Sequence, residues 1–294
     1  MLEISIDADV CTKDGLCAMT CGRAVFRQEE KATIPEIVNL ERCFRCGQCV
    51  AICPQGAISH SHFPDGTVNP IRSEYVPTYD QVLELIRSRR AKRSFKEKTV
   101  DRDVIEKVLE VARFGPSGHN EQTTEFVVIQ DEEIIHEIAS LTAGSLGRFA
   151  ERTRNPIAQM MMRFILGRRE AAARIEVAPE LGGVASLFND GTDYILRDAP
   201  VLVLFCADSV GGFSSENANL ALQNAALAAE TVGLGCFYAG FVVIASSFDD
   251  NIARYLSLPE THKIYGALAM GYPRLKFSKW PERNPAKVTW VGAE

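Results

Sequence analysis

The sequence predicts a protein of two domains that combine helices and strands. The chain has 294 residues, a length that favours about two domains. Seven of its nine cysteines lie between residues 11 and 53, while the rest of the chain alternates helical patterns with short apolar runs. A turn-rich stretch at 62–70, followed by Pro77, marks the expected junction. We therefore predict domains over residues 1–75 and 76–294.

Composition excludes several classes of partner. The chain carries 32 basic and 38 acidic residues, so it lacks the global positive field that holds nucleic acid non-specifically. No apolar run reaches the ~18 residues that cross a bilayer. The first thirty residues contain no basic segment followed by an apolar one, so a cytoplasmic location is expected. In a reducing compartment, clustered thiols bind metal more often than they form disulfides.

Hydrophobic periodicity predicts the elements of the larger domain. Asp101–Arg113 has the pattern of an amphipathic helix, with Asp101 as its N-cap and Gly115-Pro116 as its stop. Further expected elements are strands over 126–129, 201–206, 237–244 and 264–270, and a buried helix over 217–232. Residues 144–190 fit this alternation poorly. Within them 157–166 predicts a mobile amphipathic helix, whose Met160, Met161 and Met162 would either line a substrate lid or pack in the core.

One cysteine motif predicts a specific metal chemistry. Residues 43–54 read C-x2-C-x2-C-x3-C-P, the spacing of bacterial iron–sulfur proteins. Closely spaced thiolates hold one cluster, and the fourth cysteine points to a second cluster. A structural zinc site is the alternative, but seven clustered cysteines exceed the four ligands of one tetrahedral ion.

An altered copy of this motif precedes it. Cys11, Cys17 and Cys21 keep the spacing if Asp14 stands in the second cysteine position. Because a carboxylate is a harder ligand than a thiolate, it would hold iron less firmly. Two forms stay open: a [4Fe–4S] cluster ligated by Asp14, or a [3Fe–4S] cluster beside which Asp14 is only a turn residue.

Together the two motifs resemble those of bacterial-type two-cluster ferredoxins, over nearly all of residues 1–75. The resemblance implies a small βαβ-type fold and crossed ligation. The implied ligand sets are Cys43, Cys46, Cys49 and Cys21 for one cluster, and Cys11, Cys17 and Cys53 for the other, joined by Asp14 in the four-iron form.

A run of basic residues opens the larger domain. Seven of the twelve residues at 87–98 are Lys or Arg, which makes the run a candidate anion site or a solvated helix end. Three further motifs follow in order: P-S-x-x-N-x-Q at 116–122, G-L-G-x4-G at 233–240, and R-x-P at 283–285. In this order they resemble the FMN-dependent nitroreductase family over about residues 78–294. The implied fold is α+β, a mixed sheet flanked by helices, in an intertwined homodimer with FMN at the interface.

The resemblance also implies which residues hold FMN. Arg89, Arg90 and Arg283 would bind its phosphate and ribityl chain, because guanidinium groups suit phosphate. Arg93 would lie near the flavin N1 and C2 carbonyl, where positive charge stabilises the anionic reduced ring. The remaining family positions are Pro116, Ser117 and Asn120 in the ring-edge loop, and Gly240, with Ala239, as a backbone donor to flavin N5. Ala91, Gly115 and Thr123 depart from the usual family residues.

Two modules of this kind imply one electron route. Iron–sulfur clusters pass single electrons, and a flavin exchanges one or two. The leading hypothesis is an enzyme that takes electrons through its own iron–sulfur domain and reduces a small conjugated acceptor: a nitroaromatic, quinone or activated alkene. No catalytic side chain is assigned, and the donor would be reduced ferredoxin or a nicotinamide cofactor. The alternatives are an electron-transfer or redox-sensing module for a protein partner, and a specialised branch such as flavin fragmentation or reductive dehalogenation.

Overall fold

The computed structural model describes residues 1–292, which form two compact units. The first comprises Met1–Pro77 with Ser117–Gln122. The second comprises Thr78–Pro116 and the chain from Thr123 onward.

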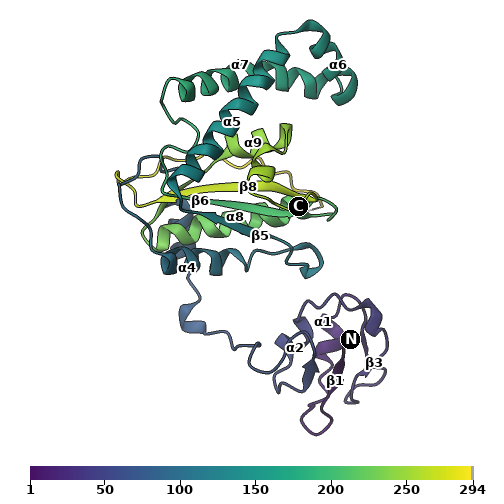
Figure 1. The fold of residues 1–294 in the computed structure, drawn as a ribbon. Coiled ribbons are helices and arrows are strands. Elements are labelled where there is room, and N and C mark those ends of the chain that lie inside the picture. Colours follow the sequence, from purple (N-terminus) through teal and green to yellow (C-terminus); the bar gives the residue numbers. More distant parts are fainter. Residues whose placement is uncertain (293–294) are drawn as a thin grey trace. The chain divides into compact units, whose positions relative to one another are not determined.

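The first unit is built from very short elements (Figure 1). In chain order they are β1 (Ile4–Ile6), α1 (Leu16–Thr20), β2 (Phe26–Arg27), β3 (Glu36–Ile37), a 3-10 turn η1 (Leu40–Arg42), α2 (Gln48–Ile52), β4 (Ile58–His60), η2 (Ser73–Tyr75) and η3 (Gly118–Asn120). β1 pairs antiparallel with β4, and β2 with β3. The buried core holds only Cys17, Val25, Phe26, Cys49, Val50 and Ile58. So small a core needs a cross-link or a metal to be stable.

A constant shift of 32 residues relates the two halves of this unit. It superimposes Cys11 on Cys43 in the sequence, and it carries α1 onto α2. Each helix follows a glycine in the left-handed region, Gly15 at φ 72° and Gly47 at φ 78°, which glycine adopts without steric cost. The two cysteine motifs therefore share a backbone as well as a spacing.

The second unit is a four-stranded antiparallel sheet between helices. Its elements are α3 (Tyr79–Ser88), α4 (Arg102–Ala112), β5 (Glu125–Ile129), α5 (Glu132–Thr153), α6 (Pro156–Leu166), α7 (Arg168–Asn189), β6 (Val201–Asp208), α8 (Ser214–Thr231), β7 (Gly235–Tyr238), α9 (Gly240–Phe248), α10 (Asn251–Tyr255) and β8 (His262–Gly271). The strand order is β5-β6-β8-β7.

Alternation along β6 creates two cores. Val201, Val203 and Phe205 join α4 and α8 in one buried cluster. Leu202 and Leu204, which point to the other face, join α5 and α9 in a second cluster. Figure 1 shows these helix pairs on opposite faces of the sheet, with α6 and α7 extending beyond α5.

The α+β class is confirmed, and several details differ from the sequence expectations. The segment predicted as a strand over 237–244 is a strand only to Tyr238, and helix α9 begins at Gly240. The named strands all pair antiparallel, and the one parallel pairing in the described residues is the isolated bridge between Ala91 and Cys236. Asp101 precedes α4 but its side chain makes no capping hydrogen bond.

Residues 144–190 are almost wholly helical. Pro179 and the pair Gly182-Gly183 lie inside α7, where they mask its helical pattern in the sequence. No residue of α6 is buried, and Met160 and Met161 are 64% and 56% exposed. These exposed fractions contradict core packing for Met160 and Met161 within this chain, whereas Met162 is partly buried.

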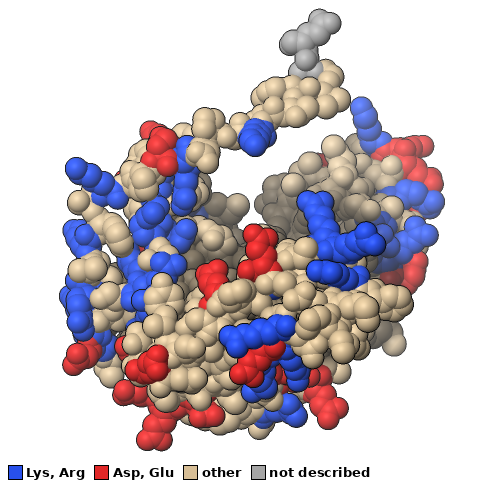
Figure 2. Space-filling view, turned by 90° about the horizontal axis from the view of Figure 1, so that it is seen from above, with Lys and Arg blue, Asp and Glu red and all other residues tan. Residues whose placement is uncertain are grey.

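The surface carries both signs of charge. On the face drawn in Figure 2, Lys and Arg side chains and Asp and Glu side chains are both exposed. In residues 1–292 no helix has the length and apolar character needed to cross a membrane.

A buried ion pair holds the segment that follows α3 in the second unit. Lys92 Nζ donates to Glu230 Oε2 at 2.5 Å, and the two side chains are only 14% and 10% exposed. The Lys92 backbone N–H also donates to Cys236 O at 3.0 Å, which ties this segment to β7. Removing one member of such a pair leaves an uncompensated buried charge.

We expect Glu230→Ala to lower the free energy of unfolding by about 3–5 kcal/mol, because Lys92 would stay buried without a partner. Glu106→Ala is the matched control: its partner Arg102 is 88% exposed, and exposed pairs contribute roughly 0–1 kcal/mol. Urea unfolding of both variants, followed by far-ultraviolet circular dichroism, measures the difference. Equal losses in the two variants would contradict the anchoring role of Glu230.

Candidate functional site

The clustered thiols of the first unit form two groups. Burial raises the pKa of Cys49 to about 11, and the thiols close enough to add to this shift are Cys43, Cys46 and Cys21. Burial also raises the pKa of Cys17, where the contributing thiols are Cys11 and Cys53. These groups have the same members as the cysteine sets of the crossed ligation pattern.

Backbone amides point at four of these sulfur atoms. The N–H groups of Lys13 and Arg45 donate to Cys11 Sγ and Cys43 Sγ, at 3.4 and 3.3 Å. Those of Val25 and Ala57 donate to Cys21 Sγ and Cys53 Sγ, also at 3.4 and 3.3 Å. Such donors stabilise a thiolate relative to a thiol, and hydrogen bonds to sulfur also tune iron–sulfur clusters.

The number of clustered thiols distinguishes between the two metal chemistries. One tetrahedral zinc ion takes four ligands, whereas the two groups together hold seven thiols. This number fits iron–sulfur chemistry better than a single zinc site. In residues 1–292 no group of three His, Cys, Asp or Glu side chains is arranged to hold one metal ion.

Asp14 and Cys46 occupy related positions but behave differently. The Asp14 carboxylate accepts hydrogen bonds from Leu16 N at 3.0 Å and Thr12 Oγ1 at 2.9 Å. It is absent from the groups that shift the Cys17 pKa, whereas Cys46 is among those that shift Cys49. Asp14 thus stabilises the first turn of α1, and the group around Cys17 contains three thiols, those of Cys11, Cys17 and Cys53.

A histidine adjoins the second motif. His60, at the end of β4, is 3% exposed, and its Nε2 lies 3.6 Å from Cys43 Sγ. Burial lowers the pKa of this imidazole. Sequence reasoning missed this contact, because the two residues are 17 positions apart and the motif ends at residue 54.

The basic run divides into one inward and several outward side chains. Lys92 forms an ion pair with Glu230. Arg89 and Arg90 are half-buried, and Arg93 is exposed. Arg93 lies over the ring of Phe237, 5.7 Å from its centroid. None of the ion pairs in the described chain involves Arg89, Arg90, Arg93 or Arg283. Their guanidinium groups are therefore not neutralised by a carboxylate, which suits an anionic ligand.

The predicted backbone donors differ from each other. The Ala239 N–H already donates to Ala267 O at 2.8 Å, so the role predicted for it at flavin N5 does not fit this geometry. Gly240 is the first residue of α9, and the amides of a first helical turn have no intrahelical acceptor. The Gly240 N–H is therefore available for the role that the family resemblance implies, as a backbone donor to flavin N5.

The remaining predicted residues lie in irregular segments. Pro116 belongs to the second unit, and Ser117 and Asn120 to the first. The Ser117 hydroxyl accepts from Gln122 N at 3.1 Å, and Asn120 has a positive φ of 57°. Arg283 is exposed in the extended C-terminal segment. Placement of these four residues at a flavin remains a prediction.

The two distant cysteines are packing residues. Cys206 and Cys236 are 1% and 0% exposed, and burial raises the pKa of each thiol to about 12. Both thiols therefore stay protonated and unreactive near neutral pH.

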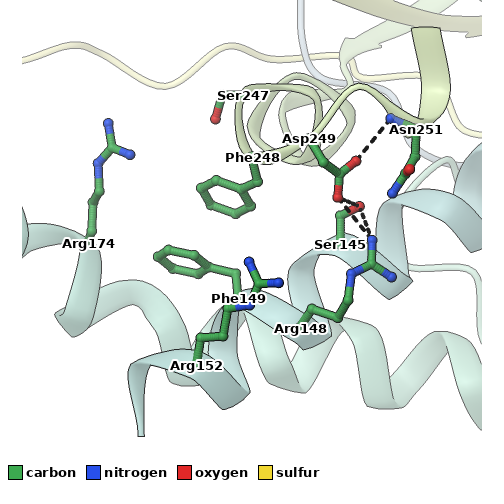
Figure 3. A pocket seen from close by; sticks show the side chains of 9 residues that line it. All are labelled: Ser145, Arg148, Phe149, Arg152, Arg174, Ser247, Phe248, Asp249 and Asn251. Carbon is green, nitrogen blue, oxygen red and sulfur yellow. Dashed lines mark hydrogen bonds and ion pairs between the residues drawn. The ribbon is translucent and has the colours of Figure 1, made fainter. Parts of the chain in front are cut away.

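A polar cavity of about 430 Å³ lies among α5, α7 and the end of α9 (Figure 3). Its floor is the stacked pair Phe149 and Phe248, with ring centroids 4.1 Å apart. Burial opposes ionisation of Asp249, but hydrogen bonds led by the one from Ser145 outweigh it and hold the Asp249 pKa below its usual value. No predicted flavin residue lines this cavity. Its one sequence signal is the i, i+4 spacing of Arg148 and Arg152 on α5.

Comparison with known proteins decides the class of the second unit. The model of the nitroreductase family matches residues 86–272, more than half of the chain. The chain belongs to the nitroreductase family. A 4Fe–4S binding domain matches residues 36–59, a range that holds the second cysteine motif. The protein is therefore an oxidoreductase of the nitroreductase family that carries a 4Fe–4S binding domain within residues 36–59.

Individual relatives are distant. A candidate NADH dehydrogenase/NAD(P)H nitroreductase from Methanothermobacter thermautotrophicus is 25% identical over 196 residues, which cover 65% of this chain and 77% of the relative. Iodotyrosine deiodinase 1 from Homo sapiens is 30% identical over 83 residues, which cover 28% of this chain and 26% of that protein. An FMN-bound nitroreductase structure from Bacteroides fragilis has a TM-score of 0.52 at 21% identity, over 73% of this chain and 99% of that one. This last likeness shows the shared nitroreductase fold.

Proposed function

We propose that the enzyme takes electrons through its cysteine-bound clusters and delivers them at its flavin site to a small conjugated acceptor. The observation that supports this route most is the presence, in one chain, of a 4Fe–4S binding domain and a nitroreductase domain. The acceptor would be a nitroaromatic, a quinone or an activated alkene. The donor would be reduced ferredoxin or a nicotinamide cofactor, and the working form a homodimer.

We infer two clusters in the first unit. The grouping of Cys21, Cys43, Cys46 and Cys49 supports a four-thiolate [4Fe–4S] site. Cys11, Cys17 and Cys53 supply three thiolates to the other site. Because both oxygens of Asp14 accept local hydrogen bonds, the observations favour the [3Fe–4S] form over an aspartate-ligated four-iron form.

The chain's own residues would hold and tune FMN. When bound, FMN supplies the interconversion of one-electron and two-electron transfer. Arg89, Arg90 and Arg283 would bind the phosphate, with no carboxylate to compete for them. Arg93 would place positive charge beside the N1 and C2 side of the ring, which favours the reduced anion. The Gly240 N–H would face N5, since its amide is free of an intrahelical acceptor.

Reductive dehalogenation of an aromatic substrate is the second candidate reaction. The 30% identity to human iodotyrosine deiodinase 1 over 83 residues favours it. Analysis of the products formed from a halogenated phenol would separate this reaction from simple electron delivery to a quinone.

An acceptor screen tests the proposed reaction. We expect flavin absorbance of the anaerobically reduced protein to return rapidly after stopped-flow mixing with a nitroaromatic, and a single catalytic cycle to deliver two electrons. Parallel reductions with NADH and with reduced ferredoxin identify the donor. Slow reoxidation by every small acceptor, together with tight binding of a redox protein, would support the electron-carrier alternative instead.

Arg89→Ala should weaken FMN binding roughly tenfold to a hundredfold, because a hydrogen bond to a charged group contributes about 1.5–3 kcal/mol. Arg283→Ala should show a similar loss. Lys96→Ala is the matched control, since Lys96 is exposed in the same basic run and has no predicted role at the phosphate. Fluorescence titration of the apoprotein with FMN measures the three dissociation constants. Full flavin retention in both arginine variants would remove them from the phosphate site.

Asp14→Cys should convert the proposed three-iron site to a four-iron site, because it restores the missing thiolate of the motif. Iron content should rise by about one atom per chain, and the electron paramagnetic resonance signal of the oxidised three-iron cluster should disappear. Asp9→Cys adds a thiol outside the motif and should change neither quantity. An unchanged signal in Asp14→Cys would show that residue 14 does not lie next to iron.

A further inference from the structure

His60 is a buried polar side chain beside a predicted cluster ligand. It is 3% exposed, and its ring packs edge-on against Phe63 with centroids 5.1 Å apart. Its Nε2 lies 3.6 Å from Cys43 Sγ, within hydrogen-bonding distance for sulfur. The matched 4Fe–4S segment ends at residue 59, so His60 lies just outside it.

Local geometry fixes where the proton of His60 resides. The backbone N–H of His62 donates to His60 Nδ1 at 3.1 Å. A ring nitrogen that accepts a hydrogen bond carries no proton, so the neutral ring is protonated at Nε2. The Nε2–H group is therefore the donor to Cys43 Sγ, which also accepts from Arg45 N.

This second donor is confined to one half of the repeat. The 32-residue shift places Gln28 where His60 stands. Gln28 Nε2 donates instead to the carbonyls of Lys13 at 3.1 Å and Thr33 at 2.7 Å. Among the described contacts, Cys11 Sγ has only the Lys13 N–H as a donor, whereas Cys43 Sγ has two.

We propose that His60 raises the reduction potential of the cluster ligated by Cys43, by donating its Nε2–H to the Cys43 thiolate. This inference rests on the proposed role of Cys43 as a ligand. Reduction by one electron adds one negative charge, which is shared with the thiolate sulfurs, and no proton is transferred. A hydrogen-bond donor stabilises the more negative state more strongly, so the reduced form gains relative to the oxidised form. His60 is thus a positioning and tuning residue, not a ligand.

Redox titration of the full chain tests this role. We expect His60→Phe, prepared without oxygen, to keep its iron and sulfide content but to show a more negative midpoint potential for the Cys43 cluster. Electron paramagnetic resonance at pH 8 follows this cluster, with the other centre as an internal reference. His60→Gln should recover part of the shift, because its amide nitrogen can reach the position of Nε2.

His62→Ala is the matched control. It removes an exposed ring but keeps the backbone N–H that orients His60, so the midpoint should stay at the wild-type value. An unchanged midpoint in a fully loaded His60→Phe variant would overturn the inference, as would an equal shift in His62→Ala. If wild-type protein assembled no cluster, the proposed function itself would fail.

His60→Phe could fail to bind iron, so a second measurement uses protein that retains His60. Pulsed electron paramagnetic resonance of reduced His62→Ala protein carrying ¹⁵N-histidine should detect a nitrogen coupled to the cluster. Absence of this coupling in loaded protein would overturn the hydrogen bond.

Discussion

Ligation of the buried thiols is the constraint on which the first unit depends. Its core holds six buried residues, two of which are cysteines, and its strands are only two or three residues long. Apolar burial on this scale does not offset the conformational entropy lost in ordering the chain. Because burial raises the pKa of Cys49 to about 11, its thiol is protonated near neutral pH until metal displaces the proton. Folding of this unit and assembly of its cluster are therefore linked, and the N–H groups aimed at sulfur prepare the thiols for that step.

In the second unit the main constraint is electrostatic, because several positive charges lie close together in the run at 87–98. The basic run would repel itself if all its side chains pointed the same way. Lys92 turns inward to Glu230, and the bridge between Ala91 and Cys236 fixes the same segment to β7. The neighbouring arginines are left without carboxylate partners. The ion pair of Lys92 thus holds this segment in place, while its arginines stay available for the proposed phosphate of FMN.

Local patterns and distant contacts explain what the sequence could predict. Cysteine spacing is a local property set by cluster geometry, so the two motifs and their resemblance to those of ferredoxins could predict the two thiol groups. The run Phe241–Ala245 is apolar and short, and periodicity cannot separate a strand from a buried helix at that length. The contact between His60 and Cys43, and the ion pair between Lys92 and Glu230, join residues 17 and 138 positions apart. Such pairs depend on tertiary packing and leave no signature in a single sequence.

The repeat in the first unit is symmetric in backbone but not in chemistry. Asp14 replaces the thiol of Cys46, and Gln28 replaces the sulfur-directed donor of His60. Both differences change the charge or the hydrogen bonding around sulfur, which are the main determinants of cluster potential. In the proposed two-cluster form, two equal centres would share an electron evenly, whereas two unequal centres would favour one location for it. The repeat thus keeps one backbone and changes two side chains that would set the potentials of the proposed clusters.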